Sequence, residues 1–223
     1  MLDVTQAWKS AYPGACVGLL LVEGVENPDH DPALDQAKAE LEESLRSRFK
    51  DRASIMDLPV VQAYDAHFKR FNKTYHVQLQ LESVALKGKT IPRVAAVVEA
   101  MFMAELDNAL LTAGHDFREI SPPLTLGVSS GQERYTRLNG QEQELKPNDM
   151  MVTDDRGVIS SVIYGPDQRT RITPATTEAL FFVYAPRGIG EARVRAHLQD
   201  ILRNVRCVSP TAQVRAEEVY PTF

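Results

Sequence analysis

The chain has 223 residues, a net charge of −5, 43% hydrophobic residues and 25% charged residues. These values are typical of a globular protein large enough to build a core without disulfides or a structural metal, which excludes the disordered, fibrous and disulfide-rich classes. The acidic balance also excludes a generally basic nucleic-acid-binding protein, so any contact with RNA needs a local basic surface.

The first half of the chain is predicted to be mainly helical after one strand. Residues 16–22 form a continuous apolar run that stops before Gly24, which predicts a buried strand. Asp31 is suited to cap a helix that has Pro32 at its first position and an apolar face extending to Phe49. The same spacing predicts further helices over residues 59–72, 77–86 and 92–111, the last of them stopped by Gly114.

From residue 121 the pattern changes to short strands. Asn139-Gly140 is the signal of a tight hairpin. The most apolar of the predicted strands is the last one and is expected to be central, and residues 191–203 form a closing helix. Because helices precede strands, we predict the α+β class and a single domain over residues 1–223. Strands are predicted over residues 124–128, 150–153, 158–164 and 179–184.

Cysteine usage and the N-terminus predict a cytoplasmic protein. Cys16 and Cys207 lie far apart and belong to no zinc motif, so we expect reduced thiols and no metal or other cofactor. Residues 1–5 carry no basic patch before an apolar core, as a signal peptide would, and no apolar run approaches the ~20 residues that span a bilayer. We therefore expect no membrane partner and no DNA partner, and the sequence defines no oligomeric state. Basic groups that either contact RNA or form solvated faces are Lys69, Arg70 and Lys73; Lys87, Lys89 and Arg93; and Arg187, Arg193, Arg195 and Arg203.

The common catalytic and phosphate-binding motifs are absent. The sequence contains no GxGxxG, GxxxxGK[ST], HExxH or GxSxG, and no two of its five histidines are spaced as metal ligands on a helix. Residues 188–190 (Gly-Ile-Gly) precede a helix but lack the rest of a phosphate fingerprint, so we interpret them as a loop. The residues alone predict only a soluble α+β domain.

Two segments carry a more specific pattern. The first combines Lys87-Gly-Lys-Thr-Ile-Pro92 with Val97-Val98-Glu99 and Gly114-His115-Asp116, and the second is Leu138-Asn-Gly-Gln-Glu-Gln-Glu-Leu-Lys-Pro-Asn-Asp149. In type and spacing these segments resemble the editing module of the phenylalanyl-tRNA synthetase β subunit, and residues 154–158 and 167–176 resemble stand-alone members of that family. The similarity covers residues 64–203, and residues 1–63 are expected to add an N-terminal strand and helices packed on the module.

The resemblance implies a fold and an activity. The family's fold is a mixed sheet with a long helix enclosing a pocket, which in the synthetase receives a tRNA 3′ end carrying a wrongly attached tyrosine and hydrolyses the ester. Such chemistry needs a positioned water and donors to the developing oxyanion rather than a nucleophilic triad. The implied function is a stand-alone aminoacyl-tRNA deacylase that acts on mischarged tRNA in trans, with the tRNA 3′ end or an amino-acid-like small molecule as partner.

Several positions depart from the family pattern. An ungapped alignment places Met101-Phe102 at the family's Thr-Asn and Ala113 at its His, so side chains that donate hydrogen bonds are replaced by side chains that do not. Ser160-Ser161 stand near the family's Ala-Gly and change the pocket floor. One alternative is therefore a non-catalytic module that binds an amino acid, another small ligand or tRNA. A further alternative is a protein-interaction role in which side chains fill the old pocket.

The resemblance and the departures together indicate candidate substrate-binding residues, although no catalytic residue is assigned. Glu99 on the long helix either enters the pocket to bind an amino group or is solvated. His115, after the expected helix stop, either holds a ligand or water or is partly exposed. Only one of two successive strand serines faces a given pocket. The candidate residues are Glu99, Phe102, His115, Ser160, Ser161, Tyr164 and Gly165.

Overall fold

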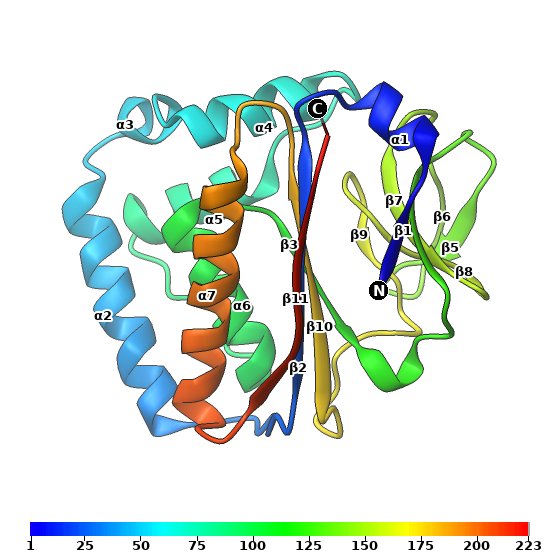
Figure 1. Cartoon of the computed structure of the whole chain (residues 1–223). Coiled ribbons are helices and arrows are strands. Elements are labelled where there is room, and N and C mark those ends of the chain that lie inside the picture. Colours follow the sequence, from blue (N-terminus) through cyan, green and yellow to red (C-terminus); the bar gives the residue numbers. More distant parts are fainter. Residues whose placement is uncertain (223) are drawn as a thin grey trace.

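A computed structural model describes residues 1–222. The fold contains a four-stranded sheet and a five-stranded sheet. Figure 1 shows a layer of helices on one side, the first sheet edge-on in the middle and the second sheet on the other side. The predicted α+β class is confirmed, and the sheets draw strands from both ends of the chain. The helices are α1 (Gln6–Ala11), α2 (Pro32–Arg48), α3 (Arg52–Met56), α4 (Pro59–Lys69), α5 (His76–Ala85), α6 (Ala96–Asn108) and α7 (Glu191–Val208).

The four-stranded sheet is antiparallel throughout. Its strands are ordered β11 (Gln213–Pro221), β2 (Cys16–Glu23), β10 (Glu178–Ala185) and β3 (Thr112–Asp116). The two inner strands, β2 and β10, are nearly continuous apolar runs, as strands covered on both faces require. The prediction that the apolar strand near residue 180 is central is therefore confirmed.

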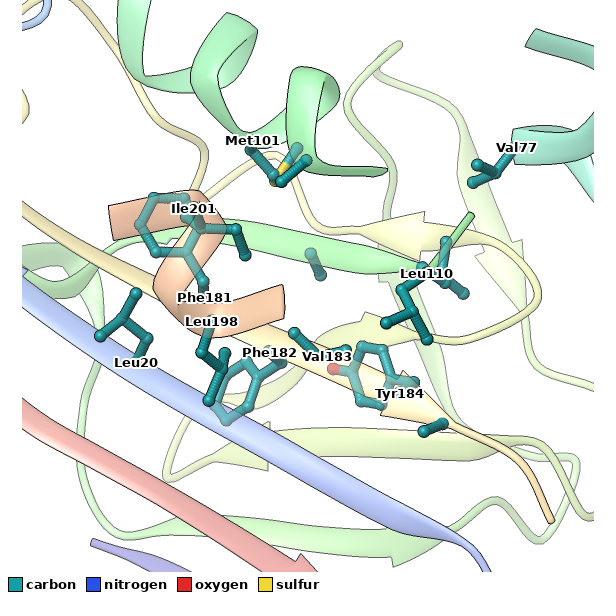
Figure 2. Close-up of a cluster of buried hydrophobic side chains, with 14 of the residues drawn as sticks. Leu20, Val77, Met101, Leu110, Phe181, Phe182, Val183, Tyr184, Leu198 and Ile201 are labelled. Atoms are coloured by element: carbon teal, nitrogen blue, oxygen red, sulfur yellow. The ribbon is translucent and has the colours of Figure 1, made fainter. Parts of the chain in front are cut away.

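Alternate side chains of β10 contact opposite layers. Phe181 lies beside Gly114 on the face that α6 covers, whereas Phe182 packs against the ring of His115 and Tyr184 reaches Ser160 in the second sheet. Figure 2 shows the apolar cluster that results on the helical side, where side chains of β2, β10, α6 and α7 meet. Labelled members of this cluster include Leu20, Met101, Phe181, Leu198 and Ile201.

The second sheet has the order β1 (Leu2–Val4), β4 (Leu124–Val128), β7 (Met150–Asp154), β8 (Gly157–Ser161) and β9 (Gly165–Pro166). Beside it lies a separate hairpin of β5 (Arg134–Thr136) and β6 (Glu142–Glu144), joined where the sequence predicts a tight turn. A short 3-10 turn, η1 (Phe117–Glu119), follows β3. The β9 end of this sheet approaches β3, so both sheets meet at that edge (Figure 1).

The long helix is shorter than its sequence pattern predicts. It begins at Ala96 and ends at Asn108, because Ala109 adopts a left-handed conformation with φ 52°. The hydroxyl of Tyr75 donates to the carbonyl of Ala109, and the next residues turn into β3 rather than continuing to Gly114. His115 therefore lies within a strand and not after a helix stop, which corrects the expected local structure. No helix described in residues 1–222 has the length and apolar composition needed to cross a membrane.

Candidate ligand-binding site

A cavity of about 480 Å³ lies at the β3 edge of the four-stranded sheet, between α6 and the β8–β9 end of the second sheet. Its volume is within the range of small-molecule sites. Most of its wall is apolar and comes from α6, β3 and the segments after β8 and β9. The apolar lining includes Val98, Met101, Phe102, Leu111, Val162 and Ile172.

Among residues 1–222, the cavity lining contains one carboxyl group, which belongs to Glu105. It comes from the inner face of α6 and is 2% exposed. One of its oxygens, Oε1, accepts a hydrogen bond from the backbone N–H of Thr112 at 2.6 Å, and within residues 1–222 no hydrogen bond to Oε2 is found. Burial raises the pKa of Glu105 to about 8, although the Thr112 hydrogen bond acts in the opposite direction. The cavity therefore contains a carboxyl group that is largely protonated at neutral pH and that a cationic ligand would ionise.

A buried hydrogen-bond chain holds Thr112 in place behind the cavity. The Thr112 hydroxyl lies 2.8 Å from Nε2 of His197, and Nδ1 of His197 lies 3.1 Å from the Asn108 amide, which donates to Asp200. Burial lowers the pKa of His197 to about 3, so this imidazole is neutral. These hydrogen bonds fix the start of β3 and therefore the backbone N–H of Thr112 that orients Glu105.

Opposite α6, Ser161 lines the cavity near the end of β8. Its hydroxyl donates to Asp149, and its oxygen accepts a hydrogen bond from the backbone N–H of Tyr164 at 3.1 Å. Asp149 is fully buried, and burial raises its pKa to about 7 while the Ser161 hydrogen bond lowers it. A hydroxyl at the cavity wall is thus coupled to a carboxyl group that exchanges protons near neutral pH.

The mouth of the cavity is more polar than its floor. His76 and Gln80 of α5, Leu138 of the β5–β6 hairpin and Arg171 of the segment before β10 are exposed and lie around the opening. Arg171 donates through Nη1 to the carbonyl of Gln168 at 2.9 Å, which holds the guanidinium beside the entrance. A ligand that enters here passes one cation before it meets the apolar wall.

The sequence model of the B3/4 domain matches residues 62–217, most of the chain. The chain belongs to the B3/4 domain family. Its fold is similar to the crystal structure of an N-terminal fragment of the phenylalanyl-tRNA synthetase β subunit from Pyrococcus horikoshii, with a TM-score of 0.52 and 12% sequence identity over 99% of this chain and 54% of that one. No curated protein matches the sequence. The predicted resemblance to the synthetase β subunit is confirmed, and the B3/4 domain described here is a tRNA-synthetase-related module.

Three of the seven candidate residues line the cavity of this B3/4 domain. Phe102 contributes from α6, Ser161 from β8 and Gly165 from the start of β9. Ser160 points the other way, as strand alternation requires, and its hydroxyl shares a hydrogen bond with that of Tyr184. Tyr184 itself lines the cavity, so Ser160 lies behind a lining residue.

The other three candidates lie outside the lining. Glu99 is 3% exposed and binds the ammonium group of Lys38, and it also accepts from the backbone N–H of Val94 at 2.8 Å. His115 is fully buried, and its Nδ1 lies 2.7 Å from the hydroxyl of Thr170. Burial, followed by the charge of Arg169, lowers the pKa of His115 to about 3, so it is a neutral core residue.

Tyr164 is half-buried beside the cavity, with the Lys73 ammonium 5.4 Å from its ring centroid. Its backbone N–H fixes Ser161, and this contact links it to the lining.

Glu105, Thr112 and Arg171 are polar lining residues that were not among the candidates: Glu105 and Thr112 stand in no motif, and Arg171 lies in the family-like segment 167–176. Glu105 stands six residues after Glu99, which is about 240° of helical rotation, so the two carboxylates face different neighbours. The apolar residues around Glu105 on α6 were a signal for burial. Within residues 1–222, no group of three or more His, Cys, Asp or Glu side chains has an arrangement that could hold a metal ion.

Proposed function

We propose that the cavity binds the aminoacyl group of a mischarged tRNA and that the protein hydrolyses its ester in trans. The observation that carries the proposal is the position of Glu105, whose Oε2 is available at the wall of an otherwise apolar cavity of about 480 Å³. An aminoacyl ester presents an α-amino group next to a side chain. The carboxylate of Glu105 would bind the ammonium form, and Met101, Phe102 and Ile172 would accept an apolar side chain.

The mouth suits the nucleotide end of the same substrate. Arg171 stands at the opening, where the terminal ribose and its phosphate would lie while the amino acid occupies the cavity. Membership of the B3/4 family and the fold shared with a synthetase β-subunit fragment support an RNA-linked substrate over a free hydrophobic molecule.

Ser161 and Asp149 would supply the proton transfer. Water held at the Ser161 hydroxyl attacks the ester carbonyl carbon, and its proton passes by way of Ser161 to Asp149. The carbon–oxygen bond to the ribose then breaks, the proton returns to the departing ribose oxygen, and the products are the free amino acid and uncharged tRNA. The pKa of about 7 allows Asp149 to accept and return a proton at neutral pH.

Incubation of the purified protein with a panel of mischarged tRNAs tests this function. We expect release of amino acids with apolar side chains above the uncatalysed rate. Glu105→Gln should lower kcat/KM on the order of tenfold or more, because it removes one charge-assisted hydrogen bond. Glu43→Gln, an exposed carboxyl on α2, is the matched control and should leave the rate unchanged. Absence of hydrolysis for every charged tRNA in the panel would eliminate the deacylase.

A second candidate function is favoured by the residues at the cavity wall. Met101 and Phe102 offer no hydrogen-bond donor, although the family pattern has Thr-Asn there. This supports a module that binds an amino acid or an aminoacyl group without cleaving it. A thermal-shift screen of free amino acids and their esters separates the two candidates: stabilisation by apolar esters without turnover supports binding alone.

A further inference from the structure

A second hollow lies between α1, α4 and the loop that leads into α7. Its volume is about 420 Å³, and it shares no lining residue with the cavity at β3. Alanine and proline side chains form its apolar surface. These are Ala11, Pro13, Ala15, Ala63, Ala66 and Pro186.

Two cationic side chains flank this hollow. Arg70 follows α4 and Arg187 follows β10, and both are exposed. Lys69 beside them pairs with Asp65, whereas no ion pair to Arg70 or Arg187 is found within residues 1–222. Two arginines thus line one hollow although the protein carries a net charge of −5.

Both arginines are held by their surroundings. The guanidinium carbon of Arg70 lies 5.3 Å from the ring centroid of Tyr12 and 5.9 Å from that of Phe71, positions that favour a cation over aromatic faces. The stem of Arg187 packs on Gly14: a Cβ on Gly14 would stand 3.2 Å from Cγ of Arg187, so glycine permits this approach. Pre-positioned guanidinium groups lose less entropy when they bind an anion.

A buried histidine forms part of the wall of the same hollow. His67 lines it and is 4% exposed, and within residues 1–222 its Nε2 has no hydrogen-bond partner. Burial, reinforced by the charge of Arg70, lowers the pKa of His67 to about 4. A neutral imidazole can donate one N–H hydrogen bond, and an anionic oxygen would satisfy it.

We propose that this hollow binds a nucleotide: Arg70, Arg187 and His67 hold the phosphate, and the alanine and proline surface accepts the base. Guanidinium groups match the geometry of phosphate oxygens and can bind them through two parallel hydrogen bonds. The apolar surface extends beyond what a bare phosphate ion requires, and small side chains leave room for a planar ring. The site is independent of the ester hydrolysis proposed above, since the two hollows have different walls.

Calorimetric titration with adenosine 5′-monophosphate, adenosine and inorganic phosphate tests the site. We expect the monophosphate to bind more tightly than either of its two parts. Arg70→Gln and Arg187→Gln should each weaken binding about tenfold or more, which corresponds to the loss of one hydrogen bond to a charged group. Ala66→Trp, on the exposed surface of α4, fills the hollow without changing charge and should abolish binding.

Lys87→Gln is the control, because it removes one exposed positive charge outside the hollow. Equal weakening by this variant, or monophosphate binding no tighter than that of adenosine or phosphate, would overturn the proposal. Unchanged binding in the Arg70, Arg187 double variant would do so as well. Competition by a single-stranded RNA oligonucleotide assigns the site to a nucleotide within RNA, and its absence assigns the site to a free nucleotide. Neither result depends on whether the protein hydrolyses aminoacyl esters.

Discussion

Two carboxyl groups of α6 illustrate how position on one helix determines what a residue can do. Glu99 faces α2 and is neutralised by Lys38, whose side chain is 7% exposed. Burial acts to lower the pKa of Lys38, but hydrogen bonds from Lys38 to Asp35 and Glu99 outweigh it and raise that pKa. Glu105 lies on another face, has no cationic partner within residues 1–222 and borders a cavity. Glu99 therefore supports the fold, and Glu105 is available to a ligand.

Glu105 makes the stability of the protein depend on pH. Its pKa is raised from 4.5 to about 8 in the folded state, so the folded protein retains a proton that the unfolded chain has released. The stabilisation that this group contributes is fully present below pH 4.5 and is lost as pH rises through about 8. Over that range the free energy of unfolding falls by up to about 1.4 kcal/mol per pH unit. Glu105→Gln should flatten this slope and make the variant more stable than the wild type above pH 8. Urea denaturation at a series of pH values measures both effects.

Glu43→Gln is the control for that series, because the Glu43 side chain is exposed and its replacement removes one carboxyl group without changing the buried one. A Glu105→Gln variant with the slope of the wild type would show that the carboxyl group ionises freely in the folded protein.

Sequence patterns located part of the site. Phe102, Ser161 and Gly165 line the cavity, and Phe102 and Ser161 were found because alignment with the family pattern places them at positions where the sequence departs from it. Glu105 stands in no motif, and Arg171 lies in the segment 167–176 without being marked as a site residue, because the roles of both arise from the neighbours that folding brings together. Glu99 shows the opposite case, because its motif position carries no information about the distant Lys38.

At the scale of elements, β2 and α7 are packed with no spare volume. An added Cβ at Gly18 would stand 2.5 Å from Cγ1 of Val194 and 3.2 Å from Cδ1 of Leu198. The strand therefore needs a residue without a side chain where the helix crosses it. The predicted apolar strand and closing helix are both present in the structure, but this contact between them has no signal in the local sequence.

Gly18→Ala should destabilise the protein by about 1–3 kcal/mol, because the methyl group overpacks the contact with α7. Val194→Ala should also destabilise it by opening a void, while the double variant should recover part of the loss because the new methyl group occupies that void. Chemical denaturation of the four proteins gives the coupling energy.

Gly127→Ala in β4 is a matched strand control, since its Cβ would have only ordinary contacts at 3.9 Å. Additive effects of the Gly18 and Val194 changes would contradict the packing argument.

Two strands that the sequence patterns missed, β3 and β11, are the edge strands of the four-stranded sheet. β3 has the sequence Thr-Ala-Gly-His-Asp, which carries little strand propensity, and its apolar neighbours continue the periodicity of α6. β11 is rich in charged and polar residues and pairs only with β2, so it lacks the apolar run that marks an inner strand. Helices and inner strands could be predicted because their burial imposes a period on the sequence, whereas these edges take their conformation from the strand beside them.

At the scale of the molecule, the four-stranded sheet includes a strand that lies outside the segment matched by the family model. The family model matches residues 62–217, yet β2 stands between β10 and β11 and pairs with both. The N-terminal segment therefore supplies an inner strand of this sheet. If residues 1–63 were only additions packed on a module, the rest of the chain would fold without them, whereas this topology implies that the sheet needs β2.

A fragment that begins at residue 62 should fail to fold cooperatively, because β10 and β11 lose the strand between them and the apolar faces of α6 and α7 lose part of their contact surface. A chain lacking only residues 1–4 should remain folded, since β1 is a three-residue edge strand. Circular dichroism and thermal unfolding compare the two. Cooperative unfolding of the shorter fragment would show that residues 62–222 form an autonomous unit.

The place of β3 in the sheet has one more consequence. It pairs with β10 on one side, and its other side borders the cavity and the segment around Thr170, whose carbonyl accepts a hydrogen bond from the backbone N–H of Asp116. All five residues of β3 are buried, so this edge is protected from pairing with a strand of another molecule although β3 has a single strand partner in its sheet. Because the cavity adjoins that protected edge, a ligand bound there would stabilise the folded sheet where it meets the second one.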